Sequence, residues 1–206
     1  MNSKKICILD YGSGNVRSVF NILFALGKDV IVSNRPEDIL AGSHIILPGV
    51  GAFGTSMEKI KKTIHLDILE NEIIRNKKPF LGICVGMQVL ADRGFEFGEH
   101  VGLGWIHGEV KKMSTGGLPL PHIGWNNVSI AKQTPLLNGL SVDQDFYFVH
   151  SYVFKEENNE NVIAKTEYGE QFNSIISKDN IFGVQFHPEK SQKAGKLLLE
   201  NFLSLR

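Results

Sequence analysis

The sequence has little of what marks several large classes of protein. Its 206 residues include only two cysteines, Cys7 and Cys84, without a Cys-x-x-Cys pair, and its seven histidines show no metal-ligand spacing. We therefore expect free thiols, no structural metal and no cofactor. The apolar stretches are also short: none approaches the roughly 18 residues of a membrane span, and the one near the start is too short for a signal peptide. A cytoplasmic protein is expected.

The chain also lacks an excess of charge of either sign. Lysine and arginine together number 22, aspartate and glutamate also number 22, and no basic patch is interleaved with aromatic residues. Because nucleic-acid binding depends on clustered positive charge, we do not expect a nucleic-acid partner. Hydrophobic residues make up 42% of the chain, which is enough for a substantial core. Without internal repeats or low-complexity linkers, one domain over residues 1–206 is the simplest interpretation.

Short apolar runs alternate with helical patterns in the first half of the chain. The runs typical of buried strands are residues 5–9, 29–33, 43–47 and 79–83. One helical pattern begins after residue 15, and another covers about residues 66–75. Alternation of this kind predicts an α/β fold with a mostly parallel central sheet and helices on both faces.

The pattern changes after about residue 94. Shorter β-like runs are then separated by many turn residues, which is typical of antiparallel or mixed sheet. These runs are residues 110–113, 122–130, 146–154, 162–166 and 174–177. Another strand is expected at residues 181–186, followed by a closing helix over about residues 192–205.

Residues 82–86 (GICVG) place Cys84 where a predicted strand ends and a helix begins. A nucleophile between two such glycines is typical of a sharp, strained turn that exposes it above the sheet edge. The helix N-terminus favours a thiolate, and the N–H of Val85 can point at a developing oxyanion. The alternative is that Cys84 is a buried structural cysteine and that its neighbouring glycines are incidental. For Cys7, which lies within an apolar strand, a structural role in the core is our interpretation.

His187 and Glu189 follow the last predicted strand and could serve as the base and its orienting group. Pro188 disfavours helical geometry at His187, and in an extended segment residues two apart project to the same side. Because the carboxyl ends of parallel strands share one edge, Cys84 and His187 can meet there. The alternative is a solvated turn before a helix. Other histidines, such as His122, lack these neighbours and are assigned to surface or packing roles.

Residues 49–54 (GVGAFG) match the glycine pattern of dinucleotide-binding loops. The acidic residue expected about 20 positions later, at the end of a second strand, is missing, because Asp67 and Glu70 lie in a helical pattern. A second oxyanion donor beside Cys84 is therefore the favoured use of this loop, and nucleotide binding is the alternative.

Three segments together resemble the triad, or class-I, glutamine amidotransferases. They are residues 47–51 (LPGVG), 82–88 (GICVGMQ) and 185–189 (QFHPE). Within that family, three further segments resemble the glutaminase subunits of imidazole glycerol phosphate synthases. They are residues 10–15 (DYGSGN), 121–126 (PHIGWN) and 147–152 (YFVHSY). The resemblance covers nearly the whole chain and implies the flavodoxin-like fold of the family.

The resemblance implies a mechanism of glutamine hydrolysis. Cys84 would attack the side-chain amide of L-glutamine, His187 would protonate the departing ammonia and then activate water, and Glu189 would orient His187. The Val50–Gly51 peptide and the N–H of Val85 would stabilise the oxyanion. The positions that match glutamine-binding residues of the family are Gly49, Gln88, Ser151 and Tyr152.

The resemblance also implies a partner. Ammonia would pass through a protected channel to a (βα)8-barrel cyclase subunit in a heterodimer that makes imidazole glycerol phosphate and AICAR in histidine biosynthesis. A reorienting Val50–Gly51 peptide would couple partner loading to glutaminase activity. The positions that match the docking face are Asn15, Trp125, Tyr147 and Lys190.

Other functions stay open at this point. Residues 94–110 depart from the histidine-pathway pattern and are closer to a sister group that supplies ammonia, with a cyclase-like partner, for aminating a nucleotide-linked sugar of surface polysaccharide. A cysteine hydrolase or redox sensor would keep Cys84 but would not need Gln88. A non-catalytic scaffold that binds a cyclase would not need an intact set of cysteine, histidine and glutamate.

Overall fold

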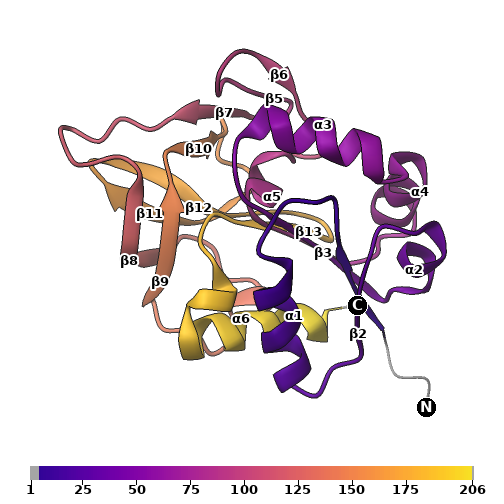
Figure 1. The fold of residues 1–206 in the computed structure, drawn as a ribbon. Helices are drawn as coiled ribbons and strands as arrows, with labels where there is room; N and C mark the ends of the chain where they lie inside the picture. Colours follow the sequence, from indigo (N-terminus) through magenta and orange to yellow (C-terminus); the bar gives the residue numbers. More distant parts are fainter. Residues whose placement is uncertain (1–4, 206) are drawn as a thin grey trace.

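One continuous sheet runs through the protein, parallel in one half and antiparallel in the other (Figure 1). The structure is a computed structural model and describes residues 5–205. The strand order is β2-β1-β3-β4-β13-β12-β11-β8-β9. The parallel strands are β1 (Ile6–Leu9), β2 (Val30–Ser33), β3 (His44–Gly49), β4 (Phe80–Cys84) and β13 (Ile181–Val184). The antiparallel strands are β8 (His122–Ile130), β9 (Asp143–His150), β11 (Val162–Tyr168) and β12 (Glu170–Lys178).

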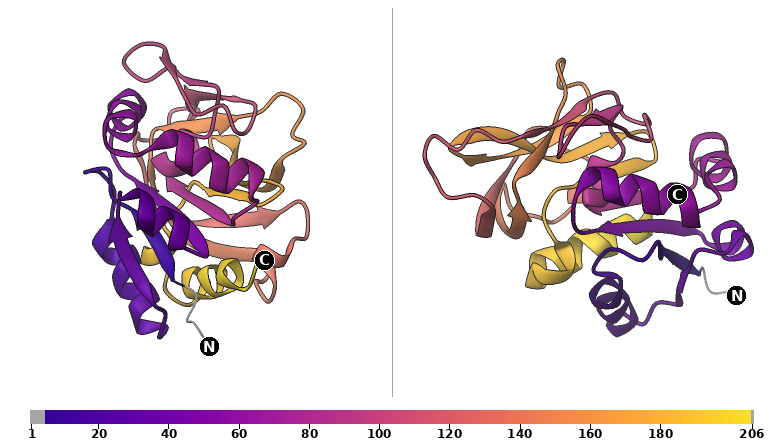
Figure 2. Two further views of the ribbon diagram at one scale, coloured as in Figure 1. Left: turned by 90° about the vertical axis from the view of Figure 1, so that its right-hand side faces the viewer. Right: turned by 45° about the horizontal axis from the view of Figure 1, so that its top comes forward.

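Helices cover both faces of the parallel half. In Figures 1 and 2, α1 (Val16–Ala25) and α6 (Gln192–Ser204) lie on one side of the parallel strands, and α3 (Phe53–Thr63) lies on the other. Every residue of β1, β3, β4 and β13 is buried. Their continuous apolar runs follow from this arrangement, because neither face of these strands meets water.

The remaining elements are a second, smaller sheet and several short helical segments. A second sheet has the order β10-β7-β5-β6. Its strands are β5 (Arg93–Gly94), β6 (His100–Val101), β7 (Glu109–Lys112) and β10 (Tyr152–Lys155). The other helical segments are α2 (Pro36–Ala41), α4 (Leu66–Glu70) with the π-helical η1 (Asn71–Arg75), α5 (Val85–Gln88), η2 (Pro135–Leu137) and η3 (Pro188–Lys190). Across residues 5–205, no helix is both long and apolar enough to cross a membrane.

The predicted α/β fold is confirmed, with two differences in the second half. The added mixed sheet is present as β10-β7-β5-β6, but the central sheet is not mostly parallel as predicted, because the antiparallel strands β8, β9, β11 and β12 extend it. The single run predicted over residues 146–154 is broken at Ser151, so that β9 lies in the large sheet and β10 in the small one. Hydrophobic spacing predicts extended backbone on both sides of such a break, but it carries no information on which sheet each part joins.

Glycines allow the turn after β4 to pack directly against β3. A Cβ atom at Gly86 would lie 1.9 Å from the carbonyl oxygen of Leu47, and one at Gly82 would lie 2.3 Å from the carbonyl oxygen of Gly86. A Cβ at Gly49 would lie 2.5 Å from the backbone nitrogen of Gly86. Each obstacle is backbone rather than a flexible side chain. The contact between β3 and α5 (Val85–Gln88) therefore requires glycine at all of these positions.

Replacing Gly86 tests this packing. Gly86→Ala is expected to lower the free energy of unfolding by about 3 kcal/mol, because the backbone of β3 must move to admit the methyl group. Gly27→Ala is the matched control. Gly27 has a positive φ of 70° but no atom within 4 Å of an added Cβ, so only backbone strain of about 1 kcal/mol is expected. Urea denaturation measures both variants, and equal losses would contradict the packing argument.

Candidate active site

Cys84 sits at the turn between β4 and α5 in a strained conformation. Its φ is 56° and its ψ is −112°, a region that costs a residue with a side chain on the order of 1–3 kcal/mol. The residue is only 4% exposed, so the sulfur opens to a cavity rather than standing above the sheet edge as predicted. Cys7 is fully buried in β1, and burial raises the pKa of its thiol to about 12, which confirms its assignment to the core.

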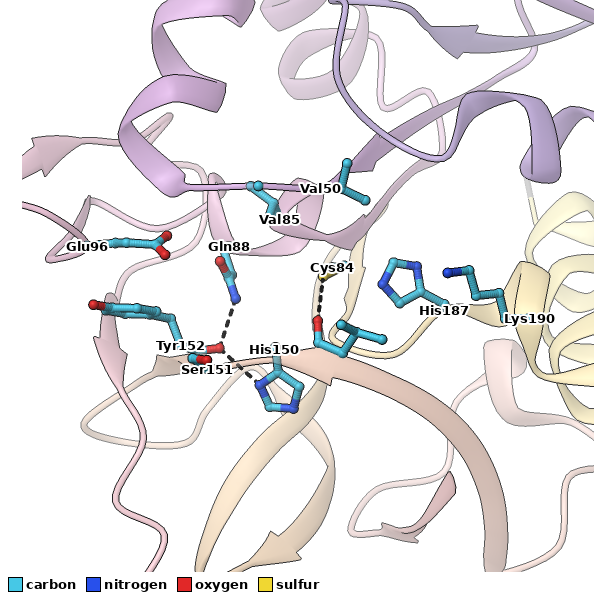
Figure 3. Close-up of a pocket in the computed structure, with 12 residues that line it drawn as sticks. Val50, Cys84, Val85, Gln88, Glu96, His150, Ser151, Tyr152, His187 and Lys190 are labelled. Atoms are coloured by element: carbon cyan, nitrogen blue, oxygen red, sulfur yellow. Dashed lines mark hydrogen bonds between the residues drawn. The ribbon is translucent and has the colours of Figure 1, made fainter. Parts of the chain in front are cut away.

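The imidazole of His187 connects Cys84 to Glu189. His187 Nδ1 donates a hydrogen bond of 2.8 Å to Glu189 Oε1, which leaves Nε2 for the sulfur. Figure 3 shows the ring of His187 beside Cys84. Burial alone would lower the pKa of His187. Hydrogen bonds to Cys84 and Glu189, together with the negative charge of both partners, overcome it and raise the pKa to about 10. The raised pKa therefore keeps His187 as an imidazolium, and a protonated imidazole beside a cysteine favours the thiolate form that acts as a nucleophile.

Backbone contacts hold His187 in place. Its N–H donates to the carbonyl oxygen of Tyr147 at 2.8 Å, and its own carbonyl accepts from the hydroxyl of Ser191 at 2.6 Å. The same hydroxyl accepts from the N–H of Tyr147 at 3.0 Å. The imidazole is thus carried by a segment fixed to β9. His187 is extended, with a φ of −103° and a ψ of 94°, as Pro188 predicted, but Glu189 lies in the 3-10 helix η3 rather than in a continuing extended segment.

Asn15 supports the carboxylate of Glu189. Asn15 Nδ2 donates to Glu189 Oε1 at 2.9 Å, the same oxygen that accepts from His187. The Glu189 side chain has no exposed surface. Asn15 precedes α1 and is predicted to belong to a docking face, but in this structure its amide is bonded to the candidate triad.

A cavity of about 170 Å³ adjoins the sulfur. It is smaller than the roughly 300 Å³ at which drug-sized sites begin, so it suits a molecule the size of an amino acid. Its lining residues include the predicted Val50, Gly51, Cys84, Val85, Gln88, Ser151, Tyr152, His187 and Lys190. Gly49 is not among them; it packs against the turn after Cys84.

Gln88 is held so that one polar atom is left for a ligand. Both of its amide hydrogens are used inside the protein, one toward the carbonyl oxygen of Tyr152 at 2.9 Å and one toward Gln185 Oε1 at 3.1 Å. Gln185 is fully buried and donates in turn to the sulfur of Cys84 at 3.7 Å. Gln88 therefore offers its carbonyl oxygen to the cavity as an acceptor, and its position is tied to that of the nucleophile.

The sequence interpretation gave no role to four residues that line or adjoin the cavity, which are Glu96, Val149, His150 and Gln185. Glu96 lines the cavity, and its Oε2 accepts from the N–H of Phe53 at 2.9 Å. It lies in the loop after β5, where no motif marks it. Gln185 lies within the QFHPE segment, and its position just before the base was the available signal. Among residues 5–205, no group of three or more histidine, cysteine or acidic side chains could hold a metal ion.

The loop predicted to stabilise the oxyanion reaches the cavity at Val50 and Gly51. The carbonyl oxygen of Val50 accepts from Ser13 Oγ at 2.8 Å, so a residue of the β1–α1 loop holds this peptide in its present orientation. Gly51 has a φ of 99°, which glycine adopts without strain. The part played by this peptide and by Val85 in oxyanion binding stays a prediction.

Three of the residues predicted for the docking face form one cluster beside the cavity. Trp125 and Tyr147 are partners across β8 and β9, with ring centroids 6.0 Å apart. Lys190 Nζ lies 5.7 Å from the centre of the Tyr147 ring. Trp125 is 48% exposed, and Lys190 also lines the cavity.

The charge state of His187 can be read directly by NMR. We expect the imidazole to keep both protons at about pH 8.5, because its pKa is raised to about 10. Its contribution to stability is then complete below its ordinary pKa and is lost as the pH rises through about 10. In Cys84→Ser one negative partner is gone, so the ring should lose a proton at lower pH. Nitrogen-15 histidine spectra measure this, and Cys7→Ser is the control that should leave the titration unchanged.

Comparisons with known proteins agree with this geometry. The family model of class-I glutamine amidotransferases matches residues 7–205. Imidazole glycerol phosphate synthase subunit HisH of Aquifex aeolicus is 45% identical over 196 residues, which cover 95% of this chain and 94% of that protein. Subunit HisH 1 of Campylobacter jejuni is 43% identical over 201 residues, which cover 97% of this chain and all of that protein.

Solved structures show the same fold at much lower identity. PurLQS from Thermotoga maritima has a TM-score of 0.75 and 18% identity, with 98% of each chain covered. A structure described as a glutamine amidotransferase has a TM-score of 0.74, also at 18% identity, and covers 96% of this chain and 97% of that chain. With a family model that spans nearly the whole sequence and relatives above 40% identity over the same length, this chain belongs to the class-I glutamine amidotransferases.

Proposed function

We propose that this chain is the glutaminase subunit of an imidazole glycerol phosphate synthase. It hydrolyses L-glutamine to glutamate and ammonia and delivers the ammonia to a cyclase subunit in histidine biosynthesis. The observation that carries the proposal is the buried contact of His187 with both Cys84 and Glu189 at the wall of an amino-acid-sized cavity. The near full-length similarity to HisH subunits supports the choice of acceptor pathway.

The reaction proceeds in two halves at the sulfur of Cys84. The thiolate attacks the side-chain amide carbon of glutamine, and the N–H groups of Gly51 and Val85 stabilise the oxyanion that forms. His187 gives its proton to the departing nitrogen, so ammonia leaves and a γ-glutamyl thioester remains. His187 then takes a proton from water, the resulting hydroxide cleaves the thioester, and glutamate is released with the thiolate restored. Glu189, supported by Asn15, keeps the imidazole oriented through both halves.

The far end of the cavity binds the amino-acid end of glutamine. The carbonyl oxygen of Gln88 and the carboxylate of Glu96 both offer acceptors, which is what an α-ammonium group requires. Main-chain groups of Ser151 and Tyr152 hold the same end of the substrate. Gly49 contributes through packing, because it lets the turn that carries Val85 lie against β3.

The ammonia passes to a second subunit, which holds the molecule that accepts it. The partner is a (βα)8-barrel cyclase that docks on Trp125, Tyr147 and Lys190 and on the loop of Asn15, and forms a heterodimer in the cytoplasm. Of these residues, Lys190 lines the cavity. The chain acts as a single domain over residues 1–206. A loaded partner reorients the Val50–Gly51 peptide, whose carbonyl is now held by Ser13, and so completes the oxyanion site.

A growth experiment tests the whole proposal. A histidine auxotroph that lacks both synthase subunits is expected to grow when this chain and its cognate cyclase are supplied together. Cys84→Ala should support growth only when the medium contains ammonium salt, because the cyclase then receives ammonia without the glutaminase. Purified complexes should show the same split between glutamine-driven and ammonium-driven synthesis.

Two results would contradict the proposed function. Loss of ammonium-driven synthesis by an intact Cys84→Ala complex would refute the division of labour between the subunits. Failure of the wild-type pair to support growth, with glutamine hydrolysis intact, would instead favour a nucleotide-linked sugar as the acceptor.

A second prediction concerns recognition of glutamine. Glu96→Gln keeps an oxygen for the N–H of Phe53 but removes the charge. We expect KM for glutamine to rise about tenfold or more, with a smaller change in kcat, because a charge-assisted hydrogen bond is lost. Glu99→Gln removes a surface carboxylate paired with Arg93 and serves as the control. Steady-state kinetics in the complex that show equal KM values for the two variants would exclude this role of Glu96.

A further inference from the structure

Two buried histidines have no part in the mechanism above. His122 in β8 and His150 at the end of β9 are directly paired across the sheet, and they are 3% and 6% exposed. Their rings pack with Phe148, Phe172 and Tyr168. His150 also lines the cavity. Since apolar side chains would fill such a site at lower desolvation cost, the polar atoms of these rings need an explanation.

The hydrogen bonds of the pair run in one direction. His150 Nδ1 lies 3.1 Å from the carbonyl oxygen of Tyr152, which can only accept, so this nitrogen carries the proton. In a neutral ring Nε2 of His150 must then accept, and its partner at 3.0 Å is Nδ1 of His122, which therefore donates. This leaves Nε2 of His122 as an acceptor, and Asn126 Nδ2 lies 3.2 Å from it.

Neutral rings are what burial favours here. Desolvation lowers the pKa of His122 to about 4 and that of His150 to about 3. A proton added to either ring would place one donor against another within the chain of hydrogen bonds. The four groups from Asn126 to the Tyr152 carbonyl are thus satisfied by a single set of tautomers.

The end of this chain is a wall of the glutamine site. The carbonyl of Tyr152 accepts from His150 and also from Gln88, and Figure 3 shows both bonds converging on that oxygen. Gln88 in turn holds Gln185, whose amide points at the sulfur of Cys84. A shift of the Tyr152 carbonyl would therefore change the orientation of the Gln88 side-chain amide, whose oxygen faces the cavity.

We propose that His150, held in one tautomer by His122, is a positioning residue for glutamine binding. It fixes the carbonyl of Tyr152 and thereby the orientation of Gln88. The inference rests on the proposed glutaminase function for its kinetic consequence, whereas the tautomers follow from the hydrogen bonds alone.

The tautomers are tested first, by nitrogen-15 histidine NMR of the isolated chain at about pH 7, where neutral rings are expected. Both His122 and His150 should carry their proton on Nδ1. In His122→Phe the preference of His150 for that form should be weaker, because only the Tyr152 carbonyl then defines it. A proton on Nε2 of His150 in the wild-type protein would overturn the proposal, whatever reaction the protein catalyses.

Kinetics in the complex with the cyclase then test the consequence. His150→Leu removes the donor to Tyr152 and is expected to raise KM for glutamine about three- to tenfold, with a smaller effect on kcat. His150→Asn places an amide donor near the position of Nδ1 and should restore much of the loss. Phe172→Leu disturbs the packing of the same rings without removing a hydrogen bond and should leave KM close to the wild-type value.

The outcomes separate the two proposals. If the wild-type complex hydrolyses glutamine but His150→Leu keeps its KM, or Phe172→Leu raises KM equally, the positioning role is wrong and the glutaminase function stands. If wild-type protein does not hydrolyse glutamine while the Nδ1 tautomers are found, the proposed function fails on its own. Thermal unfolding of each variant identifies losses that arise from misfolding.

Discussion

The site depends on one backbone contact, the approach of α5 to the end of β3. At Gly86 the chain passes so close to the carbonyl of Leu47 that no side chain fits, and Gly49 and Gly82 meet the same limit. This contact lets the backbone at Cys84 turn through a left-handed conformation and brings the sulfur beside the Val50–Gly51 loop. Strain at the nucleophile is thus balanced by packing of the strands beneath it.

Electrostatic interactions then determine the protonation of the histidines around the sulfur. His187 would be neutral if burial acted alone, and the pair Cys84 and Glu189 reverses that preference. Burial alone lowers the pKa of His122, and at His150 burial outweighs the hydrogen bond to the Tyr152 carbonyl, so both rings are neutral and work as directional donors. The cavity wall therefore contains the charged imidazole of His187 and the neutral imidazole of His150, a difference that depends on the neighbouring Cys84 and Glu189 rather than on depth in the protein.

Much of the fold and of the site could be predicted from the sequence, but only where local chemistry and spacing agree. The elbow at Cys84, the pairing of His187 with Glu189 and the parallel strands follow from glycine, proline and apolar periodicity. Glu96 and the partner of His150 could not be found in this way, because they reach the site through loops and cross-strand pairing between distant segments. The bond from Asn15 to Glu189 joins residues 174 positions apart, and no local pattern encodes it.

The interruption at Ser151 has a mechanical consequence. Residues up to His150 belong to the large sheet and those from Tyr152 to the small one, so Ser151 is one of the joints between the two sheets and lies at the wall of the cavity. Cys84 and His187 are carried by the large sheet and its connections. A small rotation of the second sheet would shift Ser151 and Tyr152 at the substrate end, and its effect would reach the sulfur through the bonds that join Tyr152, Gln88 and Gln185. Affinity for the amino-acid end and placement of the nucleophile are therefore linked, and natural variation in the second sheet would affect both.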